Sequence, residues 1–108
     1  LQMDLSGQGT KAMKKVGELT PNSTVACERV LRYTEGIEFG QFIADDRTVV
    51  AVIRNLQMIG EAVKNIPVDV RDRNPEIEWR KIAALRDVLA HTYFQLRMKL
   101  FGMLYKIR

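Results

Sequence analysis

Cysteine and histidine are scarce in this sequence, which contains one of each, Cys27 and His91. A single cysteine excludes an intrachain disulfide and any metal site built from several cysteines. Such sparing use of cysteine is typical of proteins in a reducing compartment, so we expect a cytoplasmic protein. Cys27 itself is expected to be a packing residue.

Long apolar runs are also missing. No stretch of about 18 apolar residues is available to span a bilayer. The first twenty residues lack the apolar segment of a secretory signal. These absences argue against a membrane protein and against a membrane partner. With 108 residues and an average apolar content, the chain is expected to form one domain around one core.

The charge balance is weakly basic, with a formal net charge of +4 at pH 7. An excess of lysine and arginine favours approach to a polyanion such as RNA. Most of these residues alternate with acidic ones along the expected helices, which is the usual pattern of solvated helix surfaces. The charge is therefore compatible with RNA binding but does not identify it.

The N-terminal region has glycines and scattered lysines but no sustained apolar period. We expect residues 1–20 to form a poorly defined N-terminal tail, in which helical turns between Lys11 and Leu19 remain open. Residues 21–108 are then the folded domain.

Apolar residues recur at three- and four-residue spacing in three segments, which is the period of an amphipathic helix. The sequence predicts helices over Ser23–Thr34, Arg47–Ile66 and Glu76–Leu89. The fold class expected from three such helices with short connections is all-α, an up-and-down helical bundle.

The segments between these helices contain residues typical of helix caps, turns and loops. A short helical turn is expected around Phe39 to Ile43, after which Asp45 and Asp46 can cap the second helix. Pro67 should end that helix, and the polar stretch Asp69 to Asn74 is expected to be a loop.

The only histidine lies in the segment that contains the best candidates for a functional site, together with Arg86 and Tyr93. At about 100° per residue, Arg86 and Tyr93 fall on one face of a helix, whereas His91 lies about 140° from Arg86. For Arg86 and His91 to converge, the helix must distort or end near Ala90, or a second copy of the chain must complete the site.

Completion of the site by a second copy would suit the chemistry of RNA cleavage. Metal-free RNA cleavage needs a base for the 2′-hydroxyl, an acid for the leaving oxygen and a cation for the phosphorane. A two-fold dimer would supply two copies of His91 and two of Arg86. The alternative is that His91 only caps a helix end or makes a structural hydrogen bond.

These residues also carry a resemblance to a known family. The segment from Val49 to Phe94, with "VIRNLQMIGEAVK" and "NPEIEWRKIAALRDVLAHTYF", resembles the HepT-like ribonuclease toxins of the HEPN superfamily. "LRYTEG" at Leu31 to Gly36 fits the end of their first helix, and Arg86, His91 and Tyr93 match their RxxxxHxY motif. Residues 95–108 depart from the family pattern.

The resemblance implies a homodimeric, metal-independent ribonuclease toxin of a type VII toxin–antitoxin system, with RNA, tRNA among the candidates, as substrate. Arg86 and His91 would be catalytic, and no cofactor would be needed. Tyr93 would be the regulatory position, to which an MntA-like nucleotidyltransferase antitoxin transfers AMP. The added charge would oppose RNA binding.

Three further residues have weaker support. Asp87 could orient Arg86 or His91, or form a solvent-facing pair with Arg86. Asn55 and Glu61 could line the dimer cleft, or lie on a helix surface, which we prefer for Asn55. The second functional hypothesis is a non-catalytic HEPN module that binds a nucleotidyltransferase or a nucleotide on the same surface.

Overall fold

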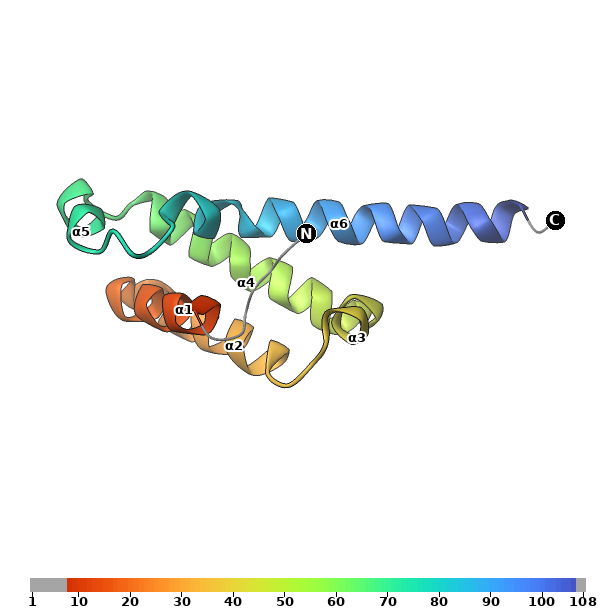
Figure 1. Cartoon of the computed structure of the whole chain (residues 1–108), viewed down its shortest axis with the longest axis horizontal. Coiled ribbons are helices and arrows are strands. Elements are labelled where there is room, and N and C mark those ends of the chain that lie inside the picture. The colour runs from red at the N-terminus through yellow and green to blue at the C-terminus, as the bar shows by residue number, and fades with distance from the viewer. Residues whose placement is uncertain (1–7, 107–108) are drawn as a thin grey trace.

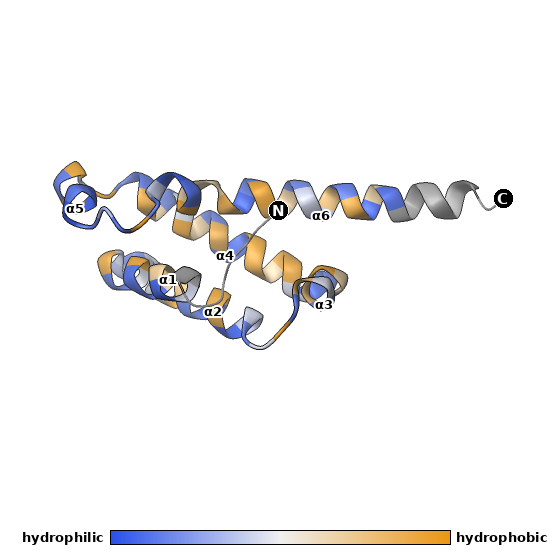
Figure 2. Cartoon of the chain, viewed as in Figure 1, coloured by the Kyte–Doolittle hydropathy of each residue, from blue (hydrophilic) through white to orange (hydrophobic). Residues whose placement is uncertain are grey.

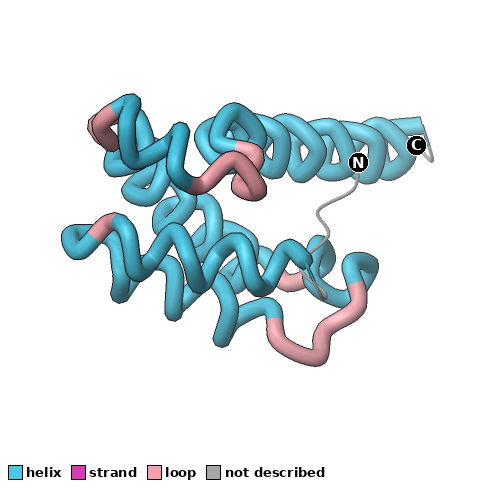
Figure 3. The backbone as a smooth tube through the Cα atoms, turned by 60° about the vertical axis from the view of Figure 1, so that its left-hand side comes forward, coloured by secondary structure: helices cyan, strands magenta, loops and turns pink. Residues whose placement is uncertain are grey.

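The computed structural model describes residues 8–106 of the chain, and the side chains of residues 10–99. All regular structure in this range is helical, which confirms the predicted all-α bundle (Figures 1 and 3). The elements are α1 (Gln8–Leu19), the 3₁₀ turn η1 (Pro21–Ser23), α2 (Thr24–Thr34), α3 (Phe39–Ala44), α4 (Asp46–Lys64), α5 (Val68–Arg73) and α6 (Trp79–Lys106).

The helices form successive layers around α4. One side of α4 packs against α2, which in turn packs against α1, and the other side packs against α6. Figure 1 shows α6 extending along most of one side of the molecule, with α5 beyond its N-terminal end and its own C-terminal end beyond α3. The molecule is therefore elongated, about 57 Å long and 25 by 21 Å across.

Helix α4 forms where the sequence predicts it. The apolar residues of its inner face recur at three- and four-residue spacing, and five of them are buried: Val49, Val52, Leu56, Ile59 and Val63. Asp45 caps its start, because the Asp45 carboxylate accepts hydrogen bonds from the Thr48 backbone N–H at 3.3 Å and from the Thr48 hydroxyl at 2.7 Å. Figure 2 shows this central helix as the most continuously apolar element.

The first helix corrects the expectation of a poorly defined tail. Residues 8–19 form α1, and Met13 and Val16 are fully buried in the core, whereas residues 1–7 lie outside the described part of the chain. Gly17 allows α1 and α2 to approach closely, since a Cβ there would lie 3.2 Å from the Cβ of Cys27. Burial raises the pKa of the Cys27 thiol to about 11, in keeping with a packing role.

The connection between α4 and α6 contains a second correction. The stretch predicted as a loop forms the short helix α5, from Val68 to Arg73, after Pro67. The Arg71 guanidinium donates to the Val63 carbonyl oxygen at 2.6 Å, at the C-terminal end of α4. The Ile66 backbone N–H also donates to this oxygen at 3.1 Å, so Arg71 adds a second donor at the end of α4, and the polar segment has a structural role.

Candidate functional site

Helix α6 carries Arg86, His91 and Tyr93, and it is continuous from Trp79 to Lys106. The distortion near Ala90 that would bring Arg86 and His91 together within one chain is therefore absent. On an unbroken helix Arg86 and Tyr93 share a face, and His91 lies about 140° from Arg86. One chain alone therefore does not bring these two side chains together.

Arg86 and Asp87 form a solvent-facing pair. The Arg86 Nε lies 3.3 Å from an oxygen of Asp87, and the two side chains are 43% and 75% exposed. Exposed pairs of this kind contribute little to stability, because water screens the charges. The guanidinium of Arg86 is therefore accessible to an anion from solvent.

His91 lies on the outer surface of α6 and is exposed. At roughly 100° per residue it shares this outward face with Asp87 and Phe94, while Leu89 on the opposite side is fully buried against α4. The imidazole is thus available to a ligand or a second chain. The helix-end capping role considered for it does not apply, since α6 continues for fifteen further residues to Lys106.

Tyr93 belongs to a cluster that joins α6 to the start of α4. Its hydroxyl donates to the Asp46 carboxylate at 2.7 Å, and Arg97 lies 3.3 Å from the other oxygen of Asp46. The Arg97 guanidinium carbon also lies 5.9 Å from the centre of the Tyr93 ring. Asp46 is the first residue of α4, where a negative charge is favoured by the helix dipole.

The cluster affects the ionisation of Tyr93. The hydrogen bond to Asp46 raises the pKa of the Tyr93 phenol, partial burial and the negative charge of Asp46 add to the increase, and Arg97 opposes it. Tyr93 is therefore held as a neutral phenol whose proton points at a carboxylate. The sequence indicated Asp46 only as a capping residue, because its contact with Tyr93 spans 47 positions.

The two candidates on α4 have different environments. Asn55 is only 6% exposed, and its side-chain amide donates to the Ala51 carbonyl oxygen at 2.7 Å, so the preferred helix-surface assignment was wrong. Glu61 is exposed on the helix surface. Among the described residues, no hydrogen bond or ion pair joins either of them to Arg86, His91 or Tyr93.

Other kinds of site find little support in the described part of the chain. No three His, Cys, Asp or Glu residues there are grouped so that they could hold a metal ion. Of the helices described, none combines the length and the apolar character needed to cross a membrane.

Comparison with known proteins identifies a family for this chain. The family model "Ribonuclease HepT-like" matches residues 24–100. A Thermococcus cleftensis protein named "Probable ribonuclease HepT" is 49% identical over 69 residues, which are 64% of this chain and 63% of the relative. A Caldanaerobacter subterraneus protein named "Putative RNase" is 41% identical over 68 residues, 63% of this chain and 61% of the relative.

The matched segments thus cover somewhat less than two thirds of these relatives. No solved structure matches the chain significantly. The family model spans the core helices and all the motif residues, from the first residue of α2 into the C-terminal half of α6. The chain therefore belongs to the HepT-like ribonuclease family, and its fold is an all-α HEPN bundle.

Proposed function

We propose that this protein is a metal-independent endoribonuclease toxin whose active site forms between two copies of the chain, with Arg86 and His91 as catalytic residues. Membership of a ribonuclease family supports the reaction class. The main observation in support of a site shared between two copies is that α6 is unbroken. It holds Arg86 and His91 on different faces and leaves His91 exposed.

A two-fold dimer could bring Arg86 of one copy close to His91 of the other. Each copy would present one histidine and one guanidinium, and symmetry would place the two sets around a common cleft. Arg86 is available for this role because its partner Asp87 is itself exposed and competes only weakly with a phosphate. The site is then complete only in the dimer.

The chemistry follows from two imidazoles and two guanidinium groups. One neutral His91 accepts the proton of the RNA 2′-hydroxyl as its oxygen forms a bond to phosphorus. The protonated His91 of the second copy donates a proton to the 5′-oxygen as the phosphorus–oxygen bond breaks. The products are a 2′,3′-cyclic phosphate and a 5′-hydroxyl, and Arg86 stabilises the charge on the non-bridging oxygens meanwhile.

Tyr93 provides the control of this site in the proposal. A nucleotidyltransferase antitoxin would transfer AMP from ATP to the Tyr93 hydroxyl, forming an oxygen–phosphorus bond and releasing pyrophosphate. Asp46 is placed to accept the phenolic proton, since it already holds that proton at a distance of 2.7 Å between oxygens. The attached phosphate would repel RNA on the face shared with Arg86. These events would take place in the cytoplasm.

The test is cleavage of total RNA and of tRNA by the purified protein in the presence of a chelator. His91→Ala should abolish cleavage while the helical circular dichroism is retained. Val88→Ala, on the same helix and also exposed, is the matched control and should cleave normally. A folded wild-type protein without any cleavage would contradict the proposal and favour the alternative, a non-catalytic HEPN module that binds a nucleotidyltransferase or a nucleotide.

The shared site has a separate test. Wild-type and His91→Ala chains are mixed, allowed to exchange, and assayed at constant total protein. If both histidines act in one site, an equal mixture retains about one quarter of the activity, since only dimers of two wild-type chains work. Retention of one half would show that each chain acts by itself.

A further inference from the structure

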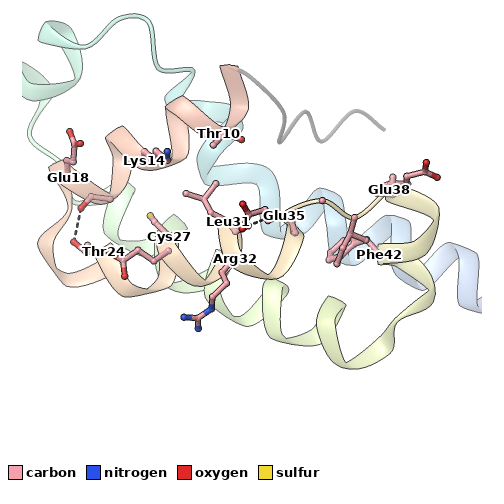
Figure 4. Close-up of a pocket in the computed structure, with 16 residues that line it drawn as sticks. Thr10, Lys14, Glu18, Thr24, Cys27, Leu31, Arg32, Glu35, Glu38 and Phe42 are labelled. Atoms are coloured by element: carbon pink, nitrogen blue, oxygen red, sulfur yellow. Dashed lines mark hydrogen bonds between the residues drawn. The ribbon is translucent and has the colours of Figure 1, made fainter.

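A groove lies between α3 and the α1–α2 pair (Figure 4), and none of the motif residues lines it. Its volume is about 1000 Å³. Leu31, Ile37, Phe39 and Phe42 line it, and the side chains of Ile37 and Phe39 are each 40% exposed. This α1–α3 groove therefore exposes apolar surface that the described part of the chain does not cover.

The rim of the groove is acidic. The lining contains four carboxylates, Glu18, Glu28, Glu35 and Glu38, and two cationic side chains, Lys14 and Arg32. In Figure 4 the Arg32 side chain points away from the groove, and its guanidinium carbon lies 5.3 Å from the centre of the Tyr33 ring. The groove thus favours an occupant that is apolar on one side and basic on its edges.

The C-terminal half of α6 has those properties. This projecting segment, residues 94–106, runs beyond the bundle in Figure 1, and its Phe94 and Met98 are 62% and 53% exposed. Phe94, Met98, Phe101 and Tyr105 recur at spacings of four, three and four in the sequence, as in one stripe of a helix. No acidic residue follows Asp87, whereas Arg97, Lys99 and Lys106 are basic.

We propose that the projecting segment of one copy docks in the α1–α3 groove of a second copy. The stripe that begins at Phe94 would cover the apolar floor, and the lysines would face the glutamates of the rim. The lengths are similar, because residues 94–106 span about 20 Å as helix and α2, which forms one groove wall, spans about 17 Å.

A second copy fits better than the same chain. To reach its own groove the segment would have to fold back across α3, and this requires a break in α6, which is continuous to Lys106. Docking between copies leaves α6 intact. The proposal does not depend on the ribonuclease function, because neither the groove nor the projecting segment contains Arg86, His91 or Tyr93.

Cross-linking with isotope labels tests the contact directly. A photoreactive phenylalanine analogue replaces Ile37 in the full-length protein, and ¹⁵N-labelled and unlabelled chains are mixed before irradiation. The expected product joins the groove of one chain to a peptide from residues 94–106 of a chain with the other label. Products within single chains only, or products that contain residues 1–7, would overturn the proposal.

Two substitutions of similar exposure provide the matched comparison. Met98→Asp puts a charge in the docking stripe and should lower the yield of mixed-label product at least tenfold, whereas Met58→Asp on the surface of α4 should leave it unchanged. Exposed fractions of 53% and 44% make both variants compatible with folding. Equal yields from the two variants would contradict the docking of this stripe.

Charge reversal tests the rim. Lys99→Glu should weaken the association, and mixing it with Glu35→Lys should restore a contact between unlike variants. Glu76→Lys, outside the groove, is the control and should not restore it. Because the cross-link identifies the groove itself, a failure here is distinguishable from a failure of the catalytic dimer, which RNA cleavage reports separately.

Discussion

The two halves of α6 have the same backbone conformation and opposite surroundings. Up to Tyr93 the helix packs on α4, and Leu89 is completely buried. From Phe94 onward it projects from the bundle, and the large apolar side chains of Phe94, Leu96 and Met98 face solvent. The first half is therefore fixed by tertiary packing, and the second is helical by propensity and continuity with the first. The motif residues lie in the packed half, close to its end.

The largest difference between the halves should appear in truncation of one side chain in each. Leu89→Ala should lower the free energy of unfolding by about 3 kcal/mol, because it removes buried contacts and leaves a cavity. Phe94→Ala in the projecting half should change it by less than about 0.5 kcal/mol. Urea denaturation followed by circular dichroism measures both, and equal losses would show that the second half packs as tightly as the first.

The close approach of α4 to the packed half provides the next test. A Cβ at Gly60 would lie 3.3 Å from the Ala83 carbonyl oxygen, so Gly60→Val should force the two helices apart and cost about 2 kcal/mol. Gly40→Val is the control, since a Cβ there has no neighbour within 4 Å. Similar denaturation midpoints for the two variants would mean that the helices do not meet at Gly60.

Ionisation of Tyr93 tests the boundary between the halves. Because the fold raises the pKa of this phenol, its contribution to stability is present below the ordinary pKa of about 10 and is lost as the pH rises through the folded value. Asp46→Asn should lower the Tyr93 pKa, and Asp69→Asn should not. Tyrosinate absorbance, with Tyr93→Phe subtracted, measures the shift. An unchanged titration in Asp46→Asn would disprove the hydrogen bond.

The smallest effect is expected at the Arg86–Asp87 pair. Asp87→Ala should change stability by less than about 0.5 kcal/mol, because the pair is exposed. The same variant should cleave RNA at a rate similar to wild type if Asp87 is only a solvent-facing partner. A large loss of cleavage with unchanged denaturation would instead assign Asp87 an orienting role.

The helices of the core were predictable because the spacing of their apolar residues is a property of the local sequence. Val49 to Val63 determines α4 without knowledge of its neighbours. For α1 the sequence left helical turns between Lys11 and Leu19 open but did not predict a core helix, because glycines and lysines conceal Met13 and Val16, which tertiary packing buries. Helix α5 was missed because its polar residues resemble a loop, although Arg71 binds the end of α4.

The candidate site divides in a similar way. Arg86, His91 and Tyr93 could be selected from one segment of sequence, and their helical spacing already placed His91 apart from the other two. The contacts of Tyr93 with Asp46 could not be predicted, since they depend on how the start of α4 meets α6. Asn55 was misplaced for the same reason, because burial on a helix depends on which neighbour covers it.

The layered order of the helices has a consequence for local opening. Helix α1 packs mainly on α2 and η1, at one edge of the stack, whereas α4 is enclosed on both sides. Among these three helices, amide hydrogen exchange should therefore be fastest in α1, slower in α2, and slowest in α4, where exchange requires global unfolding. An outer helix that opens by itself leaves the α4–α6 pair intact, so the motif-bearing half of α6 would keep its shape through fluctuations at the other edge.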